Sequence, residues 1–229
     1  MTTRTALITG ASRGLGRALA AALSDRGWHL VVDGRDPARL AEAVSSLRRV
    51  TAVPGDVADP AHRAALAEAV GPRLDLLVNN ASELGPSPLP ALAELRPEEL
   101  QHVLDVNVVA PLALAQAVLP ALRAADGTVV DISSDAAVEA YAGWGGYGAS
   151  KAALDQLTAV LAVENPDLRI YAVDPGDMAT DMHQAAFPGE DISDRPAPET
   201  VVPSLLALLD GARPSGRYRA AELVPAASR

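Results

Sequence analysis

Near its N-terminus the chain reads Thr9-Gly10-Ala11-Ser12-Arg13-Gly14-Leu15-Gly16, a glycine-rich stretch between two apolar runs. The run before it, 5–9, is strand-like, and the run after it has the apolar periodicity of a helix. Glycines at such a junction allow a tight turn and let the backbone approach a pyrophosphate, whose charge the helix N-terminus favours. The alternative is a strand–helix turn that needs positive φ and binds nothing. The position of the turn, directly after the first strand, favours a dinucleotide site.

Short aliphatic or β-branched runs alternate with longer amphipathic runs along the rest of the chain. The expected strands span 5–9, 29–32, 51–53, 74–79, 128–133 and 169–174, with a further candidate at 217–220. The expected helices span 15–26, 37–50, 60–70, 97–122, 147–163 and 198–209. Asp36-Pro37 and Asp59-Pro60 each place a capping Asp before a Pro at the first helical position. This alternation predicts one α/β domain over 1–229, a single doubly wound, Rossmann-like parallel sheet with helices on both faces.

The composition narrows the class of protein. The chain has 229 residues, of which 49% are hydrophobic and 3% aromatic, and it has no Cys, which excludes disulfides, thiolate metal sites and a Cys nucleophile. A net charge of −10 argues against nucleic acid or an anionic membrane surface as a partner. No 18 consecutive residues are apolar, and no signal-like segment opens the chain, so we expect a cytoplasmic protein. The four His show no metal-ligand spacing, and we expect no metal.

The spacing of the turn, Gly-x-x-x-Gly-x-Gly, differs from the Gly-x-Gly-x-x-Gly of many Rossmann enzymes. It resembles the short-chain dehydrogenase/reductase family, whose turn reads Thr-Gly-x-x-x-Gly-x-Gly, and the resemblance extends along nearly the whole chain. Asn79-Asn80-Ala81 resembles the family's Asn-Asn-Ala-Gly signature, with Ser82 in place of the glycine. By this resemblance the coenzyme contacts are Gly10, Ser12, Arg13, Gly14, Leu15, Gly16, Arg35, Asp56, Val57, Asn80, Ala81, Tyr147, Lys151, Pro175, Gly176 and Thr180.

The stretch Tyr147-Gly-Ala-Ser-Lys151 places a phenol and an amine on one face of a helix, because they are four residues apart. A phenol with a pKa of about 10 is a weak acid–base catalyst at neutral pH. A nearby ammonium favours the phenolate and lowers that pKa. The alternative is a chance pair on a solvated helix. The composition argues against chance, because 18 of the 19 basic residues are Arg and the single Lys is at this position.

The family resemblance implies two further catalytic residues. Ser134, 13 residues before Tyr147, matches the serine that hydrogen-bonds the substrate oxygen, with Ser133 as the alternative. Asn107 matches the asparagine that holds a water for proton relay. Its alternative role is that of a surface or helix-bend residue just before Ala110-Pro111.

Two features after the second strand indicate different coenzymes. Asp33 at the strand end could bind the adenosine ribose diol and select NAD. The family's discriminating acid, however, falls at position 34, which is Gly34 here, and Arg35 follows it. Arg35 and Arg13 match family positions that bind a 2′-phosphate, and their guanidinium groups suit a phosphate dianion. The alternative for Arg35 is a solvated residue beside the next helix. We therefore expect NADP(H) rather than NAD(H).

The substrate mouth is expected on both sides of the catalytic tyrosine. Its candidates are Asp135, Val138, Glu139, Tyr141, Trp144, Asp177, Met178 and Phe187. The Pro-, Gly- and Asp-rich stretch 187–198 is predicted to be a surface loop and a candidate lid. The acidic candidates argue against a large polyanionic substrate.

Together these features predict an oxidoreductase that transfers hydride between NADP(H) and a small carbonyl or alcohol, a ketoreductase acting on a ketone or aldehyde. An NAD-dependent alcohol dehydrogenase and a non-catalytic NADP(H)-binding sensor or scaffold are the alternatives. The presence of Tyr147, Lys151 and Ser134 argues against the sensor. The helices 97–122 and 147–163 resemble those that pair between subunits in the family, which implies a homodimer or homotetramer.

Overall fold

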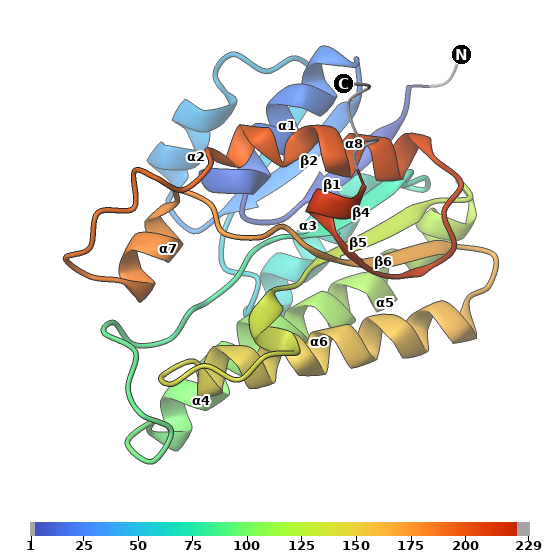
Figure 1. Ribbon diagram of the computed structural model, residues 1–229. Coiled ribbons are helices and arrows are strands. Elements are labelled where there is room, and N and C mark those ends of the chain that lie inside the picture. The colour runs from blue at the N-terminus through green and yellow to red at the C-terminus, as the bar shows by residue number, and fades with distance from the viewer. Residues whose placement is uncertain (1–2, 224–229) are drawn as a thin grey trace, which may run out of the picture.

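The computed structural model describes residues 3–223, in which seven strands form one sheet (Figure 1). The strands are β1 (Thr5–Ile8), β2 (His29–Gly34), β3 (Val50–Pro54), β4 (Leu76–Asn79), β5 (Thr128–Ile132), β6 (Arg169–Asp174) and β7 (Gly216–Arg219). Their order is β3-β2-β1-β4-β5-β6-β7, and every neighbouring pair is parallel. The predicted Rossmann-like parallel sheet is confirmed.

The order of the strands reverses at β1, which pairs with β2 on one side and with β4 on the other. In open parallel sheets the crevice for a ligand lies at the carboxyl ends of the strands at such a switch point. The central strands β1, β4 and β5 are short, mostly aliphatic runs because both faces of the sheet are covered there. Along β1, Ala6 and Ile8 belong to one buried cluster, and Leu7 belongs to the other.

Helices cover both faces of the sheet (Figure 1). One face carries α1 (Gly14–Asp25), α2 (Pro37–Val44) and α8 (Val202–Asp210), and the other carries α3 (Pro60–Val70), α5 (Ala110–Arg123) and α6 (Gly145–Glu164). Leu19 of α1 and Leu205 of α8 are buried in the first cluster, and Leu66 of α3 and Val118 of α5 are buried in the second. The caps follow the prediction, since the Asp36 and Asp59 side chains accept hydrogen bonds from the first-turn amides of α2 and α3.

The predicted helix 97–122 consists of three parts. α4 (Pro97–Leu104) continues through a π-helical turn, Asp105–Val109, into α5. The combined helix, Pro97–Arg123, is long and apolar enough to cross a membrane by length and composition alone. Leu114, Val118 and Leu122 of α5 are buried in the cluster beneath the sheet, as in the core helix of an α/β fold.

Besides the helix 97–122, and the helix 198–209, which begins as α8 at Val202 after a 3₁₀ turn, two elements differ from the prediction. The helix expected over 37–50 ends at Val44, because Val50 pairs with Leu30 as the first residue of β3. The other is α7 (Asp181–Ala186), which the sequence analysis missed, and whose N-terminus is capped by the Thr180 hydroxyl. At six residues, α7 is too short to show a helical period in the sequence. The stretch 187–197 that follows is a loop, as expected, before a 3₁₀ turn at Pro198–Thr200.

Candidate active site

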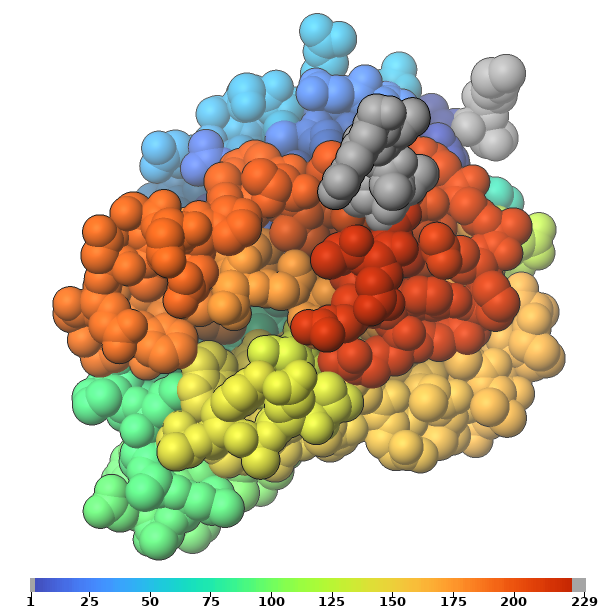
Figure 2. Space-filling view, in the orientation of Figure 1, coloured from blue at the N-terminus to red at the C-terminus, as the bar shows by residue number. Residues whose placement is uncertain are grey.

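A cleft of about 660 Å³ opens at the carboxyl ends of the central strands. In the space-filling view a recess lies between the segment that carries α7, in orange, and the segment that follows β5, in yellow (Figure 2). The cleft is lined by the glycine-rich turn, by the residues after β2, β4, β5 and β6, and by the first turns of α6. All the expected coenzyme contacts line it except Gly16.

The glycine-rich turn has the conformation that its glycines permit. Gly10 and Gly14 have φ values of +67° and +55°, in the region that side chains disfavour. Gly16 has a packing role behind the cleft wall, because a Cβ there would lie 2.6 Å from the carbonyl oxygen of Gly10. Asn80 supports the turn from β4, since its Nδ2 donates to the carbonyl oxygen of Thr9 at 2.8 Å.

Asp33 is engaged inside the protein rather than free for a ribose. Its carboxylate accepts a hydrogen bond from the Gly10 amide at 2.6 Å and lies 3.1 Å from Nε2 of His62. Burial raises the pKa of Asp33, and the hydrogen bonds from His62 and Gly10 lower it. At the next position, a Cβ on Gly34 would lie 3.0 Å from that of Ser12, so the family's acid would be crowded here. These contacts favour the NADP(H) interpretation.

Arginines gather where the glycine turn meets α2. Those that line the cleft are Arg13, Arg17, Arg35 and Arg39. Nη1 of Arg13 lies 2.9 Å from Oδ2 of Asp181, and Nη1 of Arg39 lies 3.3 Å from the same oxygen. Nη1 of Arg35 lies 3.2 Å from Oε2 of Glu83. The sequence did not single out Arg39, which lies in the first turn of α2, four residues after Arg35.

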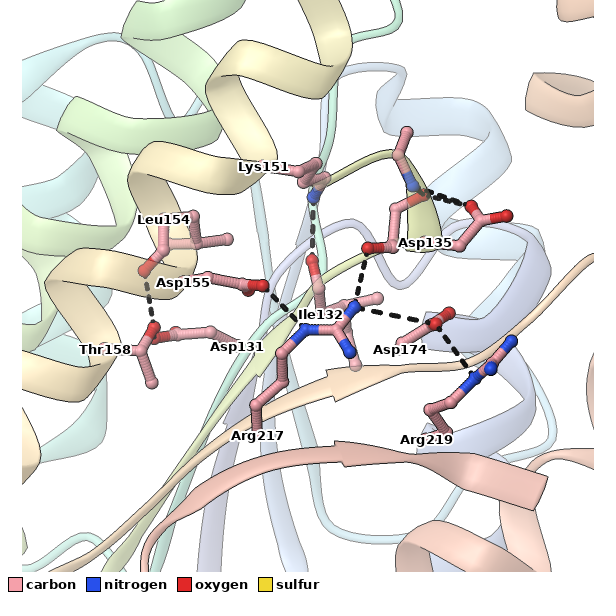
Figure 3. Close-up of polar contacts among 12 residues, drawn as sticks. Asp131, Ile132, Asp135, Lys151, Leu154, Asp155, Thr158, Asp174, Arg217 and Arg219 are labelled. Carbon is pink, nitrogen blue, oxygen red and sulfur yellow. Dashed lines mark hydrogen bonds and ion pairs between the residues drawn. The ribbon is translucent and has the colours of Figure 1, made fainter. Parts of the chain in front are cut away.

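The tyrosine and lysine project from the start of α6 into the cleft, as the four-residue spacing predicts. Both are buried. Nζ of Lys151 donates to the carbonyl oxygen of Ile132 at 2.7 Å (Figure 3). It lies 5.5 Å from the centre of the Tyr147 ring. Ser134 follows β5, and its hydroxyl donates to Oδ1 of Asp135 at 3.0 Å. The structure therefore brings Ser134, Tyr147 and Lys151 to one wall of the cleft.

Burial shifts the pKa values of both catalytic candidates. It raises the pKa of Tyr147 to about 12, against the effect of the nearby Ser82 and Ser134 hydroxyls, which lower it. Burial also lowers the pKa of Lys151 to about 8, against the nearby Asp131 carboxylate, which raises it. The phenol is thus protonated and the amine mostly charged at neutral pH. That Lys151 lowers the pKa of Tyr147 stays a prediction.

Asn107 lies behind the cleft wall, in the π-helical turn. Its Nδ2 donates to the carbonyl oxygen of Glu83 at 2.8 Å and to Oγ of Ser150 at 2.9 Å. Its Oδ1 accepts from the Glu83 amide at 2.7 Å and from Oγ of Ser82 at 3.2 Å. These four contacts occupy both N–H donors and both acceptor positions of the side-chain amide. The side chain therefore joins the segment after β4 to α6 next to Lys151, and a relay water would need the main chain of Asn107.

The part of the cleft near Tyr147 has both apolar and acidic lining residues. Its apolar lining residues are Leu84, Trp144, Met178 and Met182, and its acidic ones are Asp135, Asp174 and Asp177. The ring centres of Trp144 and Tyr147 lie 5.7 Å apart. Within residues 3–223 no group of three His, Asp or Glu side chains is placed to hold a metal ion.

Four of the predicted mouth residues do not line the cleft. The Tyr141 hydroxyl donates to carboxylates of Glu139 at 2.8 Å and Asp135 at 3.1 Å, on the exposed surface. Val138 is exposed. Phe187 packs behind the cleft wall, with its ring centre 5.9 Å from that of Trp144. Val138, Glu139 and Tyr141 were expected at the mouth because they lie between Ser134 and Tyr147 in the sequence. The turn after β5 directs them outward.

Comparison with known proteins agrees with this geometry. A family model described as short chain dehydrogenase matches residues 4–191. The oxidoreductase YciK of Escherichia coli strain K12 is 34% identical over 227 residues, which cover 93% of this chain and 89% of YciK. The sepiapterin reductase of Bos taurus is 34% identical over 202 residues, which cover 79% of this chain and 74% of that enzyme.

A solved structure is similar over nearly the whole chain. A short-chain dehydrogenase from Shigella flexneri 2a str. 301, complexed with NADP, superposes with a TM-score of 0.89 at 32% sequence identity, covering 96% of this chain and 98% of that one. The family match covers the glycine-rich turn, Ser134, Tyr147 and Lys151, which the structure brings together in one cleft. The chain belongs to the short-chain dehydrogenase family of oxidoreductases.

Proposed function

We propose that this protein is an NADPH-dependent reductase of a small ketone or aldehyde. The observation that carries the proposal is the presence of Ser134, Tyr147 and Lys151 on one wall of the cleft that also contains the glycine-rich turn. A sepiapterin reductase is among the relatives, which supports this direction, and a structural neighbour was solved with NADP, which supports this coenzyme.

The residues of the cleft fit a dinucleotide phosphate. The turn at Gly10–Gly16 would hold the pyrophosphate at the N-terminus of α1, where main-chain amides and the helix dipole favour an anion. Arg13, Arg35 and Arg39 would bind the 2′-phosphate, and Asp33 is turned inward to Gly10. The remaining contacts would be made by Ser12, Leu15, Asp56, Val57, Asn80, Ala81, Pro175, Gly176 and Thr180. When bound, the coenzyme supplies the hydride.

The side chains of the cleft wall would polarise and protonate the substrate. Ser134 and Tyr147 would donate hydrogen bonds to the carbonyl oxygen, which stabilises its developing negative charge. For this, the Ser134 hydroxyl must turn from Asp135 toward the substrate. Tyr147 then gives its proton to that oxygen, and the Lys151 ammonium stabilises the phenolate that remains. Asn107 would support reprotonation through a water at its main chain.

Oligomer state and location belong to the same proposal. We propose a homodimer or homotetramer that works in the cytoplasm as a single domain per chain. Val109, before α5, and Val160 and Val163 of α6 are exposed valines on the helices expected to pair between subunits. Burying such side chains against a second copy would remove apolar surface from water.

The test is coenzyme oxidation against a panel of aldehydes, ketones and quinones, with NADPH and NADH in parallel. We expect turnover with NADPH and a loss of about 10²- to 10⁴-fold in kcat for Tyr147→Phe, which removes the proton donor. NADPH affinity should be kept, because the hydroxyl alone is removed. Near-normal turnover in Tyr147→Phe would refute the mechanism. Binding of NADPH without turnover of any carbonyl would favour a sensor, and a preference for NAD with alcohols would favour a dehydrogenase.

A further inference from the structure

Arg217, on β7, reaches from the edge of the sheet to the back of the catalytic wall (Figure 3). Its Nε donates to Oδ2 of Asp155 at 2.8 Å, and its Nη2 donates to the main-chain carbonyl oxygen of Ser134 at 2.9 Å. The same Nη2 lies 3.6 Å from Oδ2 of Asp174. One guanidinium therefore contacts the segment after β5, helix α6 and the end of β6.

Each of these contacts is next to a residue of the proposed mechanism. Ser134 carries the hydroxyl that would bind the substrate oxygen. Asp155 follows Lys151 by four residues, so the two side chains lie on the same face of α6. Asp174 precedes the Pro175-Gly176 segment, and its Oδ1 accepts from the Gly176 amide at 3.0 Å.

The contacts are partly shielded from water, so losing one of them is more costly than losing an exposed ion pair. The side chain of Asp155 is 15% exposed and that of Arg217 28% exposed. Oδ1 of Asp155 is buried and has no hydrogen-bond partner within residues 3–223, so within that range this carboxylate relies on Arg217. Removing one partner of a shielded ion pair is costly, because the other charge is left desolvated and unpaired.

We propose that Arg217 is a positioning residue for the reduction, one that fixes the Ser134 segment relative to the helix that carries Tyr147 and Lys151. The proposal rests on the proposed function of that site. Arg217 lies on the edge strand β7, beyond the residues 4–191 that the family model matches. A planar guanidinium can bind a carboxylate and a carbonyl oxygen at once, which an ammonium on a flexible stem does poorly.

The test compares Arg217→Met with Arg219→Met, a matched control on the same strand. The Arg219 side chain is 58% exposed and lies 3.8 Å from Asp174. We expect Arg217→Met to lower kcat by about 10- to 100-fold, the loss that a small misplacement of catalytic groups produces, with the Kd for NADPH little changed. Arg217→Lys should recover part of the loss. A kcat for Arg217→Met equal to that of the Arg219→Met control would overturn the proposal.

A second variant covers the case in which Arg217→Met does not fold. Asp155→Asn keeps the shape of the side chain and weakens the link to α6. If both residues act through one link, the double variant Arg217→Lys with Asp155→Asn should lose less than the product of the two single losses. Fully multiplicative losses would contradict a shared positioning role.

Hydrogen exchange of the protein without substrate gives a readout that needs no turnover. Arg217→Met should speed the exchange of amides in 132–138 and 145–156 and leave exchange in 10–16 unchanged. In the Arg219→Met control, exchange in all three segments should be as in the wild type. Unchanged exchange in 132–138 would overturn the proposal. If the wild type reduced no carbonyl, the proposed function would fail, yet this exchange result would still show whether Arg217 holds the two segments together.

Discussion

Oδ2 of Asp181 accepts a hydrogen bond from Nη1 of Arg13 at 2.9 Å and forms an ion pair with Nη1 of Arg39 at 3.3 Å. Asp181 is the first residue of α7, whereas the two arginines belong to the glycine-rich turn and to α2. A carboxylate thus takes the place between these arginines that suits a phosphate oxygen. In the proposed function, Asp181 and the 2′-phosphate of NADPH would compete for Arg13 and Arg39.

Asp181→Asn should therefore strengthen NADPH binding and leave NADH binding unchanged. Each exposed ion pair contributes about 0.2–1 kcal/mol, so losing both should tighten the Kd for NADPH by about 2- to 30-fold. Fluorescence titration with both coenzymes measures this. The control is Asp210→Asn, which removes a surface pair with Arg26 away from the cleft. Equal changes for NADPH and NADH would show that Asp181 acts through the position of α7 and not on the phosphate.

Arg35→Ala tests the coenzyme choice by removing a cation that is expected to attract the 2′-phosphate of NADPH. Loss of one charge-assisted contact to a phosphate should weaken NADPH by about 1.5–3 kcal/mol, whereas NADH, which has no 2′-phosphate, should bind as before. Arg26→Ala, at a surface pair with Asp210, is the control. If both coenzymes weakened equally, Arg35 would be a structural partner of Glu83 and the NADP interpretation would lose its support.

The features that the sequence predicted well are local ones. Strands buried on both faces read as short aliphatic runs, and Tyr147 and Lys151 share a helix face by their spacing alone. The glycine-rich stretch predicted a tight turn between the first strand and α1, which the structure has. Such patterns are set by neighbours in the chain, so a single sequence suffices to find them.

The features that the sequence did not predict depend on residues far apart in the chain. Arg13 meets Asp181 across 168 positions, and Arg217 meets the Ser134 carbonyl across 83. Asp33 could be interpreted as a ribose ligand until its contact with the Gly10 amide was known. Charged side chains give no periodic signal, and their partners are decided by the packing of the whole sheet.

The single lysine allows a direct measurement of its pKa. With lysine labelled by ¹³C at Cε, the protein gives one side-chain resonance, that of Lys151, because the sequence has no other lysine. We expect it to titrate with a pKa of about 8, below the ordinary 10.5, because burial disfavours the charged amine. A midpoint above 10 would mean that Lys151 is solvated or held by a closer carboxylate.

The same shift predicts how stability depends on pH. Between a folded-state pKa of about 8 and an unfolded value of 10.5, the unfolded chain binds more protons at Lys151 than the folded one. The free energy of unfolding should therefore rise with pH through this window, relative to Lys151→Met, by about 2–3 kcal/mol. Urea unfolding should be measured from pH 7.5 to about 10. In this range Tyr147, with its raised pKa, stays protonated in the folded state. A constant difference between the two proteins would contradict the shift.

Lys151→Arg asks whether the amine is needed for more than its charge. Arg keeps a positive charge, so a purely electrostatic role predicts a mild defect. The pocket, however, is built for a compact group, since Lys151 is buried and its Nζ donates to the Ile132 carbonyl at 2.7 Å. A guanidinium is larger, planar and forked, and it cannot take this position without moving α6 or the end of β5.

We therefore expect Lys151→Arg to lose most of its activity, to bind NADPH more weakly, and to shift its pH–rate profile to higher pH. The shift follows because each unit by which the pKa of Tyr147 rises corresponds to about 1.4 kcal/mol of lost phenolate stabilisation. Turnover measured against pH, together with the Kd for NADPH, covers all three outcomes. Behaviour like that of the wild type would mean that any cation serves here and that the single lysine is an accident of composition.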